Sequence, residues 1–342
     1  MKFYSLRSLA IASLAAEKMD LSEKLISTQK QEYKMVWKSE IIKKVLDQAE
    51  KIASSDFPVL ISGESGTGKE LLARRIYRKS KRSNNQFVSV NCAAIPDHLI
   101  ESELFGHAKG SFTDAIRDRT GYFERANLGT LFLDEVTELT LSAQGKLLRI
   151  LQDGRFQRVG DEIELESDVR VIAATNRKLE DCVRLGKFRQ DLYYRLAVLQ
   201  IALPPLRGRL DDITVLAEHF LKKHSTNNDD APTSLSTEAM SALLLYRWPG
   251  NIRELQNSLE RAVIMGKGKE KITLNELALP NKESNAVEYV ERNLKSAMKL
   301  FKRNFIREVL EEHDGNRTIA ANTLGIQRTY LSRIIKELNI DI

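Results

Sequence analysis

The sequence has little of the material from which disulfide scaffolds and zinc sites are built. Its 342 residues include two cysteines, Cys92 and Cys182, which lie far apart and have no neighbouring histidines. This number and spacing exclude a disulfide framework and a Cys/His zinc site. Two unpaired thiols suit a reducing compartment, so we expect a cytoplasmic protein whose cysteines are ordinary buried or half-buried residues.

Long hydrophobic runs are also missing. No stretch approaches the roughly 18 apolar residues that span a membrane, so we expect no membrane partner. Residues 9–16 form a short apolar segment after Lys2 and Arg7 and loosely resemble a signal peptide. The segment is short and rich in alanine, which favours an amphipathic helix or the remnant of a longer N-terminal region. Residues 1–36 as a whole indicate a polar, helix-prone leader without a core of its own.

The sequence also lacks a strong excess of positive or negative charge. Lys and Arg number 53 against 47 Asp and Glu, which gives a formal net charge of +6. This weakly basic balance is by itself poor support for a nucleic-acid partner. Hydrophobic residues make up 42% and charged residues 29%, the values of a globular protein that can bury a sizeable core.

What is present is an alternation of short apolar strands and amphipathic helices over residues 37–280, which is typical of a parallel α/β sheet. The expected strands are short and often β-branched, as strands buried on both faces are: Phe57–Ile61, Phe87–Val90, Thr130–Leu133, Val169–Ala174 and Val198–Ala202. After Leu203 the strands stop. A small helical lid is expected from the helices Asp211–Lys223, Ser236–Tyr246 and Ile252–Ile264.

A phosphate-binding loop follows the first expected strand and reads Gly63-Glu64-Ser65-Gly66-Thr67-Gly68-Lys69-Glu70. Glycines let backbone N–H groups converge on phosphate oxygens, and the following helix adds a partial positive charge at its N-terminus. Lys69 can reach the β- and γ-phosphates of ATP. The generic pattern ends in a Ser or Thr that binds Mg²⁺, whereas Glu70 takes that place here. A glycine-rich turn that binds nothing is the alternative.

A second motif, Gly129–Glu135, ends an apolar strand with two carboxylates. In this arrangement Asp134 would hold Mg²⁺, directly or through water, and Glu135 would orient and activate the attacking water. An Asp-Glu pair after a strand is more often a solvated loop. Together with the phosphate loop upstream, however, the pair predicts an ATP-hydrolysing site that uses Mg²⁺.

Further motifs occur in order along the chain: Asn91-Cys92-Ala93-Ala94, Glu103-Leu104-Phe105-Gly106-His107, Ala173-Ala174-Thr175-Asn176, Phe188–Leu196, Leu203–Arg207 and Trp248–Leu255. With the two nucleotide motifs they closely resemble the AAA+ domain of sigma-54-dependent transcription activators, or bacterial enhancer-binding proteins, over about residues 35–270. The tail resembles the Fis-type DNA-binding domain. The resemblance implies an α/β AAA+ ATPase with a central parallel sheet at 37–205, a helical lid at 206–280, a linker at 281–290 and a small all-α helix-turn-helix domain at 291–342.

The resemblance also implies roles for individual residues near the nucleotide. Asn91 corresponds to the residue that contacts the catalytic glutamate, here Glu135, and couples it to the nucleotide state. Thr175 and Asn176 resemble sensor I, within reach of the γ-phosphate, and Arg253 resembles sensor II in the lid.

Two arginines occupy the positions of the family's arginine fingers. Arg189 and Arg195 would enter the ATP site of a neighbouring subunit and stabilise charge on the transferring phosphoryl group. Because such an arginine must come from another chain, the resemblance implies a homo-oligomer, in this family a hexameric ring. A pair of solvated charges on a helix surface is the plain alternative.

The loop that contacts sigma-54 in the family reads Gly110-Ser111-Phe112-Thr113-Asp114-Ala115 in this sequence. The contact residues Phe112 and Thr113 are kept. Asp114 replaces a glycine, which adds a β-carbon and a negative charge at a surface meant for a partner. We expect the loop to keep its function, because the whole insertion is present.

The tail predicts a helix-turn-helix. Ile319, Ala320 and Leu324 are expected on one apolar face, and Gly325 breaks the chain before a second helix with an excess of basic residues. The expected contacts to double-stranded enhancer DNA lie at or near the start of that helix: Gln327, Arg328, Thr329, Tyr330 and Arg333. A helical hairpin for protein contacts is the alternative.

The sequence therefore predicts a DNA-bound hexameric ATPase that remodels the closed complex of sigma-54 RNA polymerase into the open complex. The alternative is a DNA-binding regulator of the same lineage that no longer acts through sigma-54, and Asp114 is its direct support. A protease-linked unfoldase fits less well, because it would not need the helix-turn-helix. Residues 1–36 are too few for the receiver domain that many relatives carry, so we expect control by a separate regulatory protein or by expression level.

Overall fold

The structure, a computed structural model, covers two compact units, Met1–Leu277 and Ala278–Ile342. It describes residues 35–111, 115, 117–225, 232, 234–279 and, with gaps at 304, 308, 311, 314 and 339, residues 302–340. The leader residues 1–34, the linker 281–290 and the predicted sigma-54 contacts Phe112 and Thr113 lie outside the described residues, as does Asp114.

The first unit is built on a five-stranded sheet with the strand order β2-β3-β6-β1-β7, and every neighbouring pair is parallel. The strands are β1 (Val59–Ser62), β2 (Phe87–Asn91), β3 (Thr130–Asp134), β6 (Arg170–Thr175) and β7 (Leu199–Ala202). The predicted parallel sheet is thus confirmed. The first strand begins later than expected, because Phe57 is exposed and Pro58 has no N–H to donate to a neighbouring strand.

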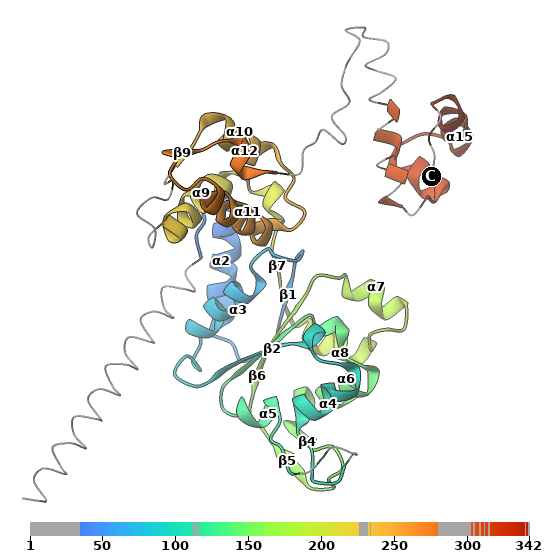
Figure 1. The fold of residues 1–342 in the computed structure, drawn as a ribbon. Helices are drawn as coiled ribbons and strands as arrows, with labels where there is room; N and C mark the ends of the chain where they lie inside the picture. Colours follow the sequence, from blue (N-terminus) through green and yellow to red (C-terminus); the bar gives the residue numbers. More distant parts are fainter. Residues whose placement is uncertain are drawn as a thin grey trace, which may run out of the picture. The chain divides into compact units, whose positions relative to one another are not determined.

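Helices cover both faces of this sheet, as the strand sequences require (Figure 1). In β3, Leu131 and Leu133 pack into the cluster formed with helices α4, α6 and α8, whereas Phe132 between them packs against α2 and α3. Successive side chains of a strand point to opposite faces, so one apolar run supplies two cores. The helices are α2 (Glu40–Ala53), α3 (Lys69–Arg78), α4 (Asp97–Phe105), α5 (Tyr122–Arg125), α6 (Leu141–Asp153), α7 (Leu179–Arg184) and α8 (Gln190–Leu196).

The predicted helical lid follows the sheet. It contains α9 (Leu210–Ser225), α10 (Thr237–Leu245), α11 (Asn251–Met265) and α12 (Leu274–Leu277), with the short parallel strands β8 (Ser234–Leu235) and β9 (Lys271–Ile272). Ser236 caps α10 by accepting a hydrogen bond from the Ala239 N–H at 3.2 Å, so the helix begins one residue later than expected. Trp248 is fully buried and donates through its indole N–H to the Leu243 carbonyl at 2.8 Å, which fixes the turn between α10 and α11.

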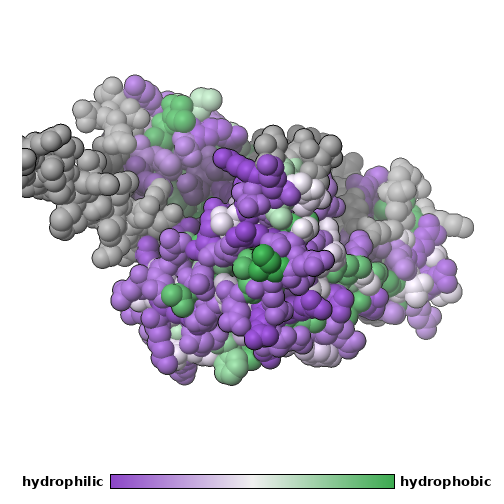
Figure 2. All heavy atoms as spheres, turned by 90° about the horizontal axis from the view of Figure 1, so that it is seen from below, coloured by the Kyte–Doolittle hydropathy of each residue, from purple (hydrophilic) through white to green (hydrophobic). Residues whose placement is uncertain are grey.

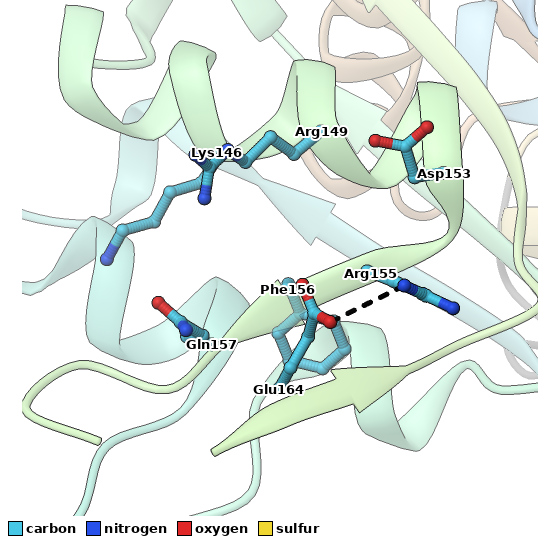
Figure 3. A pocket seen from close by; sticks show the side chains of 7 residues that line it. All are labelled: Lys146, Arg149, Asp153, Arg155, Phe156, Gln157 and Glu164. Atoms are coloured by element: carbon cyan, nitrogen blue, oxygen red, sulfur yellow. Dashed lines mark ion pairs between the residues drawn. The ribbon is translucent and has the colours of Figure 1, made fainter. Parts of the chain in front are cut away.

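The sequence patterns did not indicate the antiparallel hairpin of β4 (Arg155–Gln157) and β5 (Glu164–Glu166). Its strands are three residues long and mostly charged, so they carry little apolar alternation. The hairpin and α6 enclose a cavity of about 300 Å³ (Figure 3). Its lining contains none of the predicted nucleotide-site residues and consists of Lys146, Arg149, Asp153, Arg155, Phe156, Gln157 and Glu164.

The second unit contains the predicted helix-turn-helix, formed by α14 (Arg317–Thr323) and α15 (Arg328–Glu337). Asn316 caps α14 with its side chain, and Gly325 takes a positive φ of 65° in the turn, where a β-carbon would be strained. Ala320, Ala321 and Leu331 lie in its core. The expected apolar face is partly wrong, because Ile319 is 49% exposed and Ala321 is buried instead.

The face drawn in Figure 2 is mostly hydrophilic where its residues are described. On the face drawn in Figure 2, hydrophobic residues form separate small spots among polar ones. Scattered exposed hydrophobic side chains of this kind are ordinary on a folded domain. No helix within the described part of the chain is long and apolar enough to cross a bilayer.

Candidate nucleotide site and its lid

The phosphate loop connects the end of β1 to the start of α3, at the edge where the parallel strands end. Gly66 and Gly68 have positive φ angles of 77° and 101°. A β-carbon on Gly66 would lie 2.3 Å from the Gly250 carbonyl oxygen, so a side chain is excluded there. At Gly68, the residue before α3, a β-carbon would meet nothing within 4 Å, so the loop is open at the N-terminus of that helix. Such a place suits a phosphate group.

Lys69 is the first residue of α3 and links the loop to the second motif. Its side chain is only 6% exposed, although it carries a charge. The ammonium group donates to the Gly63 carbonyl at 2.9 Å and lies 3.4 Å from Oε1 of Glu135. A buried ammonium requires partners of this kind. The structure thus brings the lysine and the carboxylate of two distant motifs together.

Asp134 is the last residue of β3, and Glu135 follows it directly. Burial, together with the negative charge of Glu135, raises the pKa of Asp134 above its ordinary value, and the positive charge of Lys69 opposes this effect. Glu135 adopts left-handed backbone angles, φ 53° and ψ 53°, which are unfavourable for a residue with a β-carbon. Its Oε2 accepts a hydrogen bond from the Asn176 N–H at 3.1 Å. Strained backbone at such a carboxylate is typical of functional sites.

Neither cysteine of the chain is a candidate nucleophile. Both Cys92 and Cys182 are buried and free, as expected. Burial, with the charges of Asp134 and Glu135, raises the pKa of Cys92 to about 12, so the thiol stays protonated at neutral pH.

The side chain of Asn91 makes a hydrogen bond other than the one with Glu135 that the family resemblance implies. It lies opposite Asp134 in the pairing of β2 with β3, so its backbone is at the site. Its side-chain oxygen accepts a hydrogen bond from the Ala93 N–H at 3.0 Å and caps a short turn. Among the described residues it forms no hydrogen bond with Glu135, because the carboxylate is turned toward Lys69 and the Asn176 N–H.

The predicted sensor I residues lie at the end of β6, next to the carboxylates. Thr175 is buried, and its hydroxyl accepts a hydrogen bond from the Arg177 N–H at 3.0 Å. Asn176 contacts Glu135 through its backbone, whereas its side chain is exposed. The structure therefore joins sensor I to the carboxylate through a main-chain N–H.

The two predicted arginine fingers lie on the outside of the unit at α8. Arg189 forms an ion pair with Asp191 at 2.7 Å, and Arg195 donates two hydrogen bonds to the Leu151 carbonyl at 2.7 and 3.0 Å. Within the described part of the chain, neither guanidinium contacts the phosphate loop.

Side chains of the lid contact the phosphate loop, and Arg253 is the one among them whose role the sequence predicts. Arg253 of α11, the predicted sensor II, donates to the Ser65 hydroxyl at 3.0 Å. Asn251 is fully buried, takes a φ of 52°, and donates to the Ser65 carbonyl at 3.0 Å and to a Glu64 carboxylate oxygen at 3.1 Å. The motif containing Asn251 was recognisable, but its contact with a loop far upstream was not.

An ion pair reinforces this attachment. Arg207 donates two hydrogen bonds to Glu64, at 2.6 and 2.8 Å, in the bidentate geometry that favours arginine over lysine. The hydrogen bonds from Arg207 lower the pKa of Glu64, against a smaller opposing effect of burial. Glu64 therefore faces the lid. Arg209, two residues further on, also contacts the loop, through the Thr67 carbonyl at 2.9 Å.

In the second unit, the predicted DNA contacts lie at the start of α15. All five side chains are exposed: Gln327, Arg328, Thr329, Tyr330 and Arg333. The Arg333 guanidinium lies over the Tyr330 ring, 5.0 Å from its centre, which orders both side chains on one surface.

Comparison with known families matches nearly the whole chain. Residues 35–202 match the sigma-54 interaction domain, residues 207–293 match the AAA+ ATPase lid domain, and residues 298–338 match the bacterial regulatory protein, Fis family. The three matches follow the order of sheet, lid and helix-turn-helix in the structure.

Individual proteins are similar over most of the chain. The regulatory protein AtoC of Escherichia coli K12 is 47% identical over 98% of this chain and 74% of its own length. The phenol regulator MopR of Acinetobacter guillouiae is 43% identical over 96% of this chain, which spans only 61% of MopR. A crystal structure of NtrX from Brucella abortus in complex with ATP is 32% identical over 96% of this chain and 74% of that chain, with a TM-score of 0.73. This chain therefore belongs to the family of sigma-54-dependent transcription activators.

Proposed function

We propose that the protein is a DNA-bound, ring-forming ATPase that remodels the closed complex of sigma-54 RNA polymerase into the open complex. The observation that carries the ATPase part is the position of Lys69, whose ammonium group bridges the Gly63 carbonyl and the Glu135 carboxylate. This single contact unites a phosphate loop and a candidate general base, the two components that ATP hydrolysis requires. The similarity to an ATP complex of NtrX supports the same substrate.

In this mechanism the N–H groups at the start of α3 and the Lys69 ammonium bind the phosphates. Glu135 accepts a proton from the attacking water, and the Asn176 N–H keeps its carboxylate in place. The donor set fits Mg²⁺, because Asp134 and Glu135 are adjacent carboxylates. Burial and, second, the charge of Glu135 raise the pKa of Asp134, and a cation would oppose both effects. When bound, Mg²⁺ neutralises phosphate charge, and Asp134 is the residue that would hold it.

The proposed arginine fingers act on a neighbouring subunit, which makes hydrolysis depend on a ring, in this family a hexamer. Arg189 and Arg195 are exposed on α8 and pair with Asp191 and the Leu151 carbonyl of their own chain. These partners are at the surface, so assembly can exchange them for phosphate oxygens of the next subunit. A solvent-exposed ion pair such as that of Arg189 with Asp191 contributes little stability, so its exchange for another partner costs little free energy.

DNA binding and contact with sigma-54 complete the proposal. The basic start of α15 would enter the major groove of enhancer DNA, with Arg328 and its neighbours as base or phosphate contacts. Phe112 and Thr113 would contact sigma-54, as the match of residues 35–202 to the sigma-54 interaction domain supports.

A reconstituted transcription assay with sigma-54 polymerase, run beside an ATPase assay, tests the proposal. Thr113→Ala should leave ATP hydrolysis intact and abolish open-complex formation, because the loop uses its binding energy only on the partner. Asp114→Gly should keep or raise activation, because it removes a charge and a β-carbon from that surface. If the parent hydrolyses ATP and binds DNA but opens no sigma-54 promoter, while Asp114→Gly does, the protein is a regulator that has left the sigma-54 pathway.

A further inference from the structure

Arg209 lies directly before α9 and is buried against the phosphate loop, with 3% of its surface exposed. Its Nη2 donates to the carbonyl of Thr67 at 2.9 Å. This peptide joins Thr67 to Gly68 and, like the other described peptides, is not cis. In a trans peptide the C=O and the N–H point in opposite directions. Arg209 thus turns the Gly68 N–H away from itself and sets the direction of one donor of the loop.

Asp212, in the first turn of α9, connects Arg209 to a different part of the chain. It is fully buried, and its Oδ2 lies 3.9 Å from Nη1 of Arg209. Its Oδ1 accepts hydrogen bonds from the backbone N–H groups of Lys38 and Ser39, at 2.6 and 2.7 Å. Its Oδ2 also accepts the Ser39 hydroxyl at 3.0 Å. We name residues 35–39, which lead into α2, the approach segment.

This buried pair is poorly suited to a purely stabilising role. Burial lowers the pKa of Arg209, and the charge of Asp212 only partly opposes that effect. Among the described residues the Nε of Arg209 has no hydrogen-bond partner, so its desolvation is not fully compensated. Buried ion pairs of this kind contribute little net stability compared with apolar residues of similar size. What the pair does provide is orientation, because it fixes two backbone segments that are far apart in sequence.

We infer that Arg209 and Asp212 are positioning residues of the nucleotide site, and that they couple the approach segment to the phosphate loop. Arg209 orients the Thr67–Gly68 peptide for phosphate, and Asp212 orients Arg209 according to where Lys38 and Ser39 lie. The inference rests on the proposed nucleotide binding and adds a route for regulation. A partner or segment that pulls on the approach segment weakens nucleotide binding. By linkage, bound nucleotide also holds the approach segment in place.

Three substitutions in the full chain each remove a different contact between the approach segment and the phosphate loop. Asp212→Asn keeps an oxygen for the two backbone N–H groups but removes the charge that faces Arg209. Arg209→Lys keeps the positive charge but loses the planar donor that reaches Thr67. Ser39→Ala removes the hydroxyl contact with Asp212 and also the cap of α2, because the Ile42 N–H donates to the same hydroxyl at 3.4 Å. The matched control is Ser236→Ala, which also removes a serine helix cap, at the start of α10. Among the described residues Ser236 has no hydrogen bond to Arg209, Asp212 or the approach segment.

The first readout is the affinity for ADP, measured by titration calorimetry so that hydrolysis is not needed. Asp212→Asn and Arg209→Lys should each weaken ADP binding by roughly tenfold or more, as expected for loss of a hydrogen bond to a charged group. Ser39→Ala should weaken it less, and Ser236→Ala should leave it unchanged. In ATPase assays the KM of the first two variants should rise while kcat stays near the parent value, because ground state and transition state lose the same contact.

The second readout is hydrogen exchange at the amides of Lys38 and Ser39, which a merely structural role would not link to nucleotide. ADP should slow their exchange in the parent and in Ser236→Ala, but not in Asp212→Asn. If the parent binds ADP, and folded Asp212→Asn and Ser39→Ala bind it with parental affinity and show the same ADP-dependent protection, the inference is overturned. A parent chain that binds no ADP would instead refute the proposed nucleotide site, and the inference would fall with it.

Discussion

Glu135→Gln should separate nucleotide binding from hydrolysis, because the amide has nearly the shape of the carboxylate. A glutamine at this position can still accept the hydrogen bond that the Asn176 N–H donates to Oε2 at 3.1 Å. It cannot take a proton from water, and it loses the charge that lies 3.4 Å from the Lys69 ammonium. The loop keeps its own contacts, since Lys69 also donates to the Gly63 carbonyl at 2.9 Å.

The substitution should affect turnover and nucleotide affinity differently. Loss of a general base lowers the turnover rate by about 10²–10⁴-fold, or about 3–5 kcal/mol of transition-state stabilisation. Binding should stay the same or become up to about tenfold tighter, which is about 1.4 kcal/mol. The reason is that Lys69 no longer shares its charge with Glu135, and that one negative charge facing the phosphates is gone.

The assay compares ATP turnover with direct nucleotide binding for the parent, Glu135→Gln and Lys69→Ala. Lys69→Ala should lose both activities, because it removes the phosphate contact itself. A Glu135→Gln protein that hydrolyses ATP at the parental rate would show that the general base is another residue. A loss of binding equal to that of Lys69→Ala would show that Glu135 supports the loop rather than the chemistry.

Three further predictions concern charge, assembly and DNA. The raised pKa of Asp134 means that the folded chain binds this proton more tightly than the unfolded chain, so stability falls as pH rises from the ordinary value of 3.8 through the raised one. Asp134→Asn should therefore melt at a higher temperature than the parent at pH 7, with the advantage vanishing in acid; a lower melting temperature at pH 7 would contradict this. Arg195→Ala should lose roughly 10³–10⁵-fold in hydrolysis and regain part of it when mixed with Glu135→Gln subunits, whereas concentration-independent turnover by a parental monomer would exclude a trans arginine. Arg328→Ala should weaken specific DNA binding by about 1–3 kcal/mol if the arginine reads a base, or reduce the salt dependence of binding if it contacts phosphate, and an unchanged footprint would place recognition elsewhere.

Local patterns in the sequence were sufficient for the parallel sheet and for the two halves of the nucleotide site. The run Leu131-Phe132-Leu133 is apolar at every position, which predicts a strand buried on both faces, and the structure divides these residues between two cores. The glycines of the phosphate loop and the carboxylates at the end of β3 are also recognisable without coordinates. These features are predictable because each depends on a pattern of neighbouring residues, and such a pattern can be read directly from the sequence.

Tertiary structure alone decided how these parts contact one another. Asn91 caps a turn within its own motif and, among the described residues, forms no hydrogen bond with Glu135, whose carboxylate faces Lys69 and the Asn176 N–H. The contacts of Asn251 with Glu64 and of Arg209 with Thr67 join segments far apart in the chain. Sequence patterns predict the local structure around a side chain. Its partner in a distant segment depends on how whole helices pack. For that reason the residue motifs of the site and the lid helices were predictable, and the contacts between the lid and the phosphate loop were not.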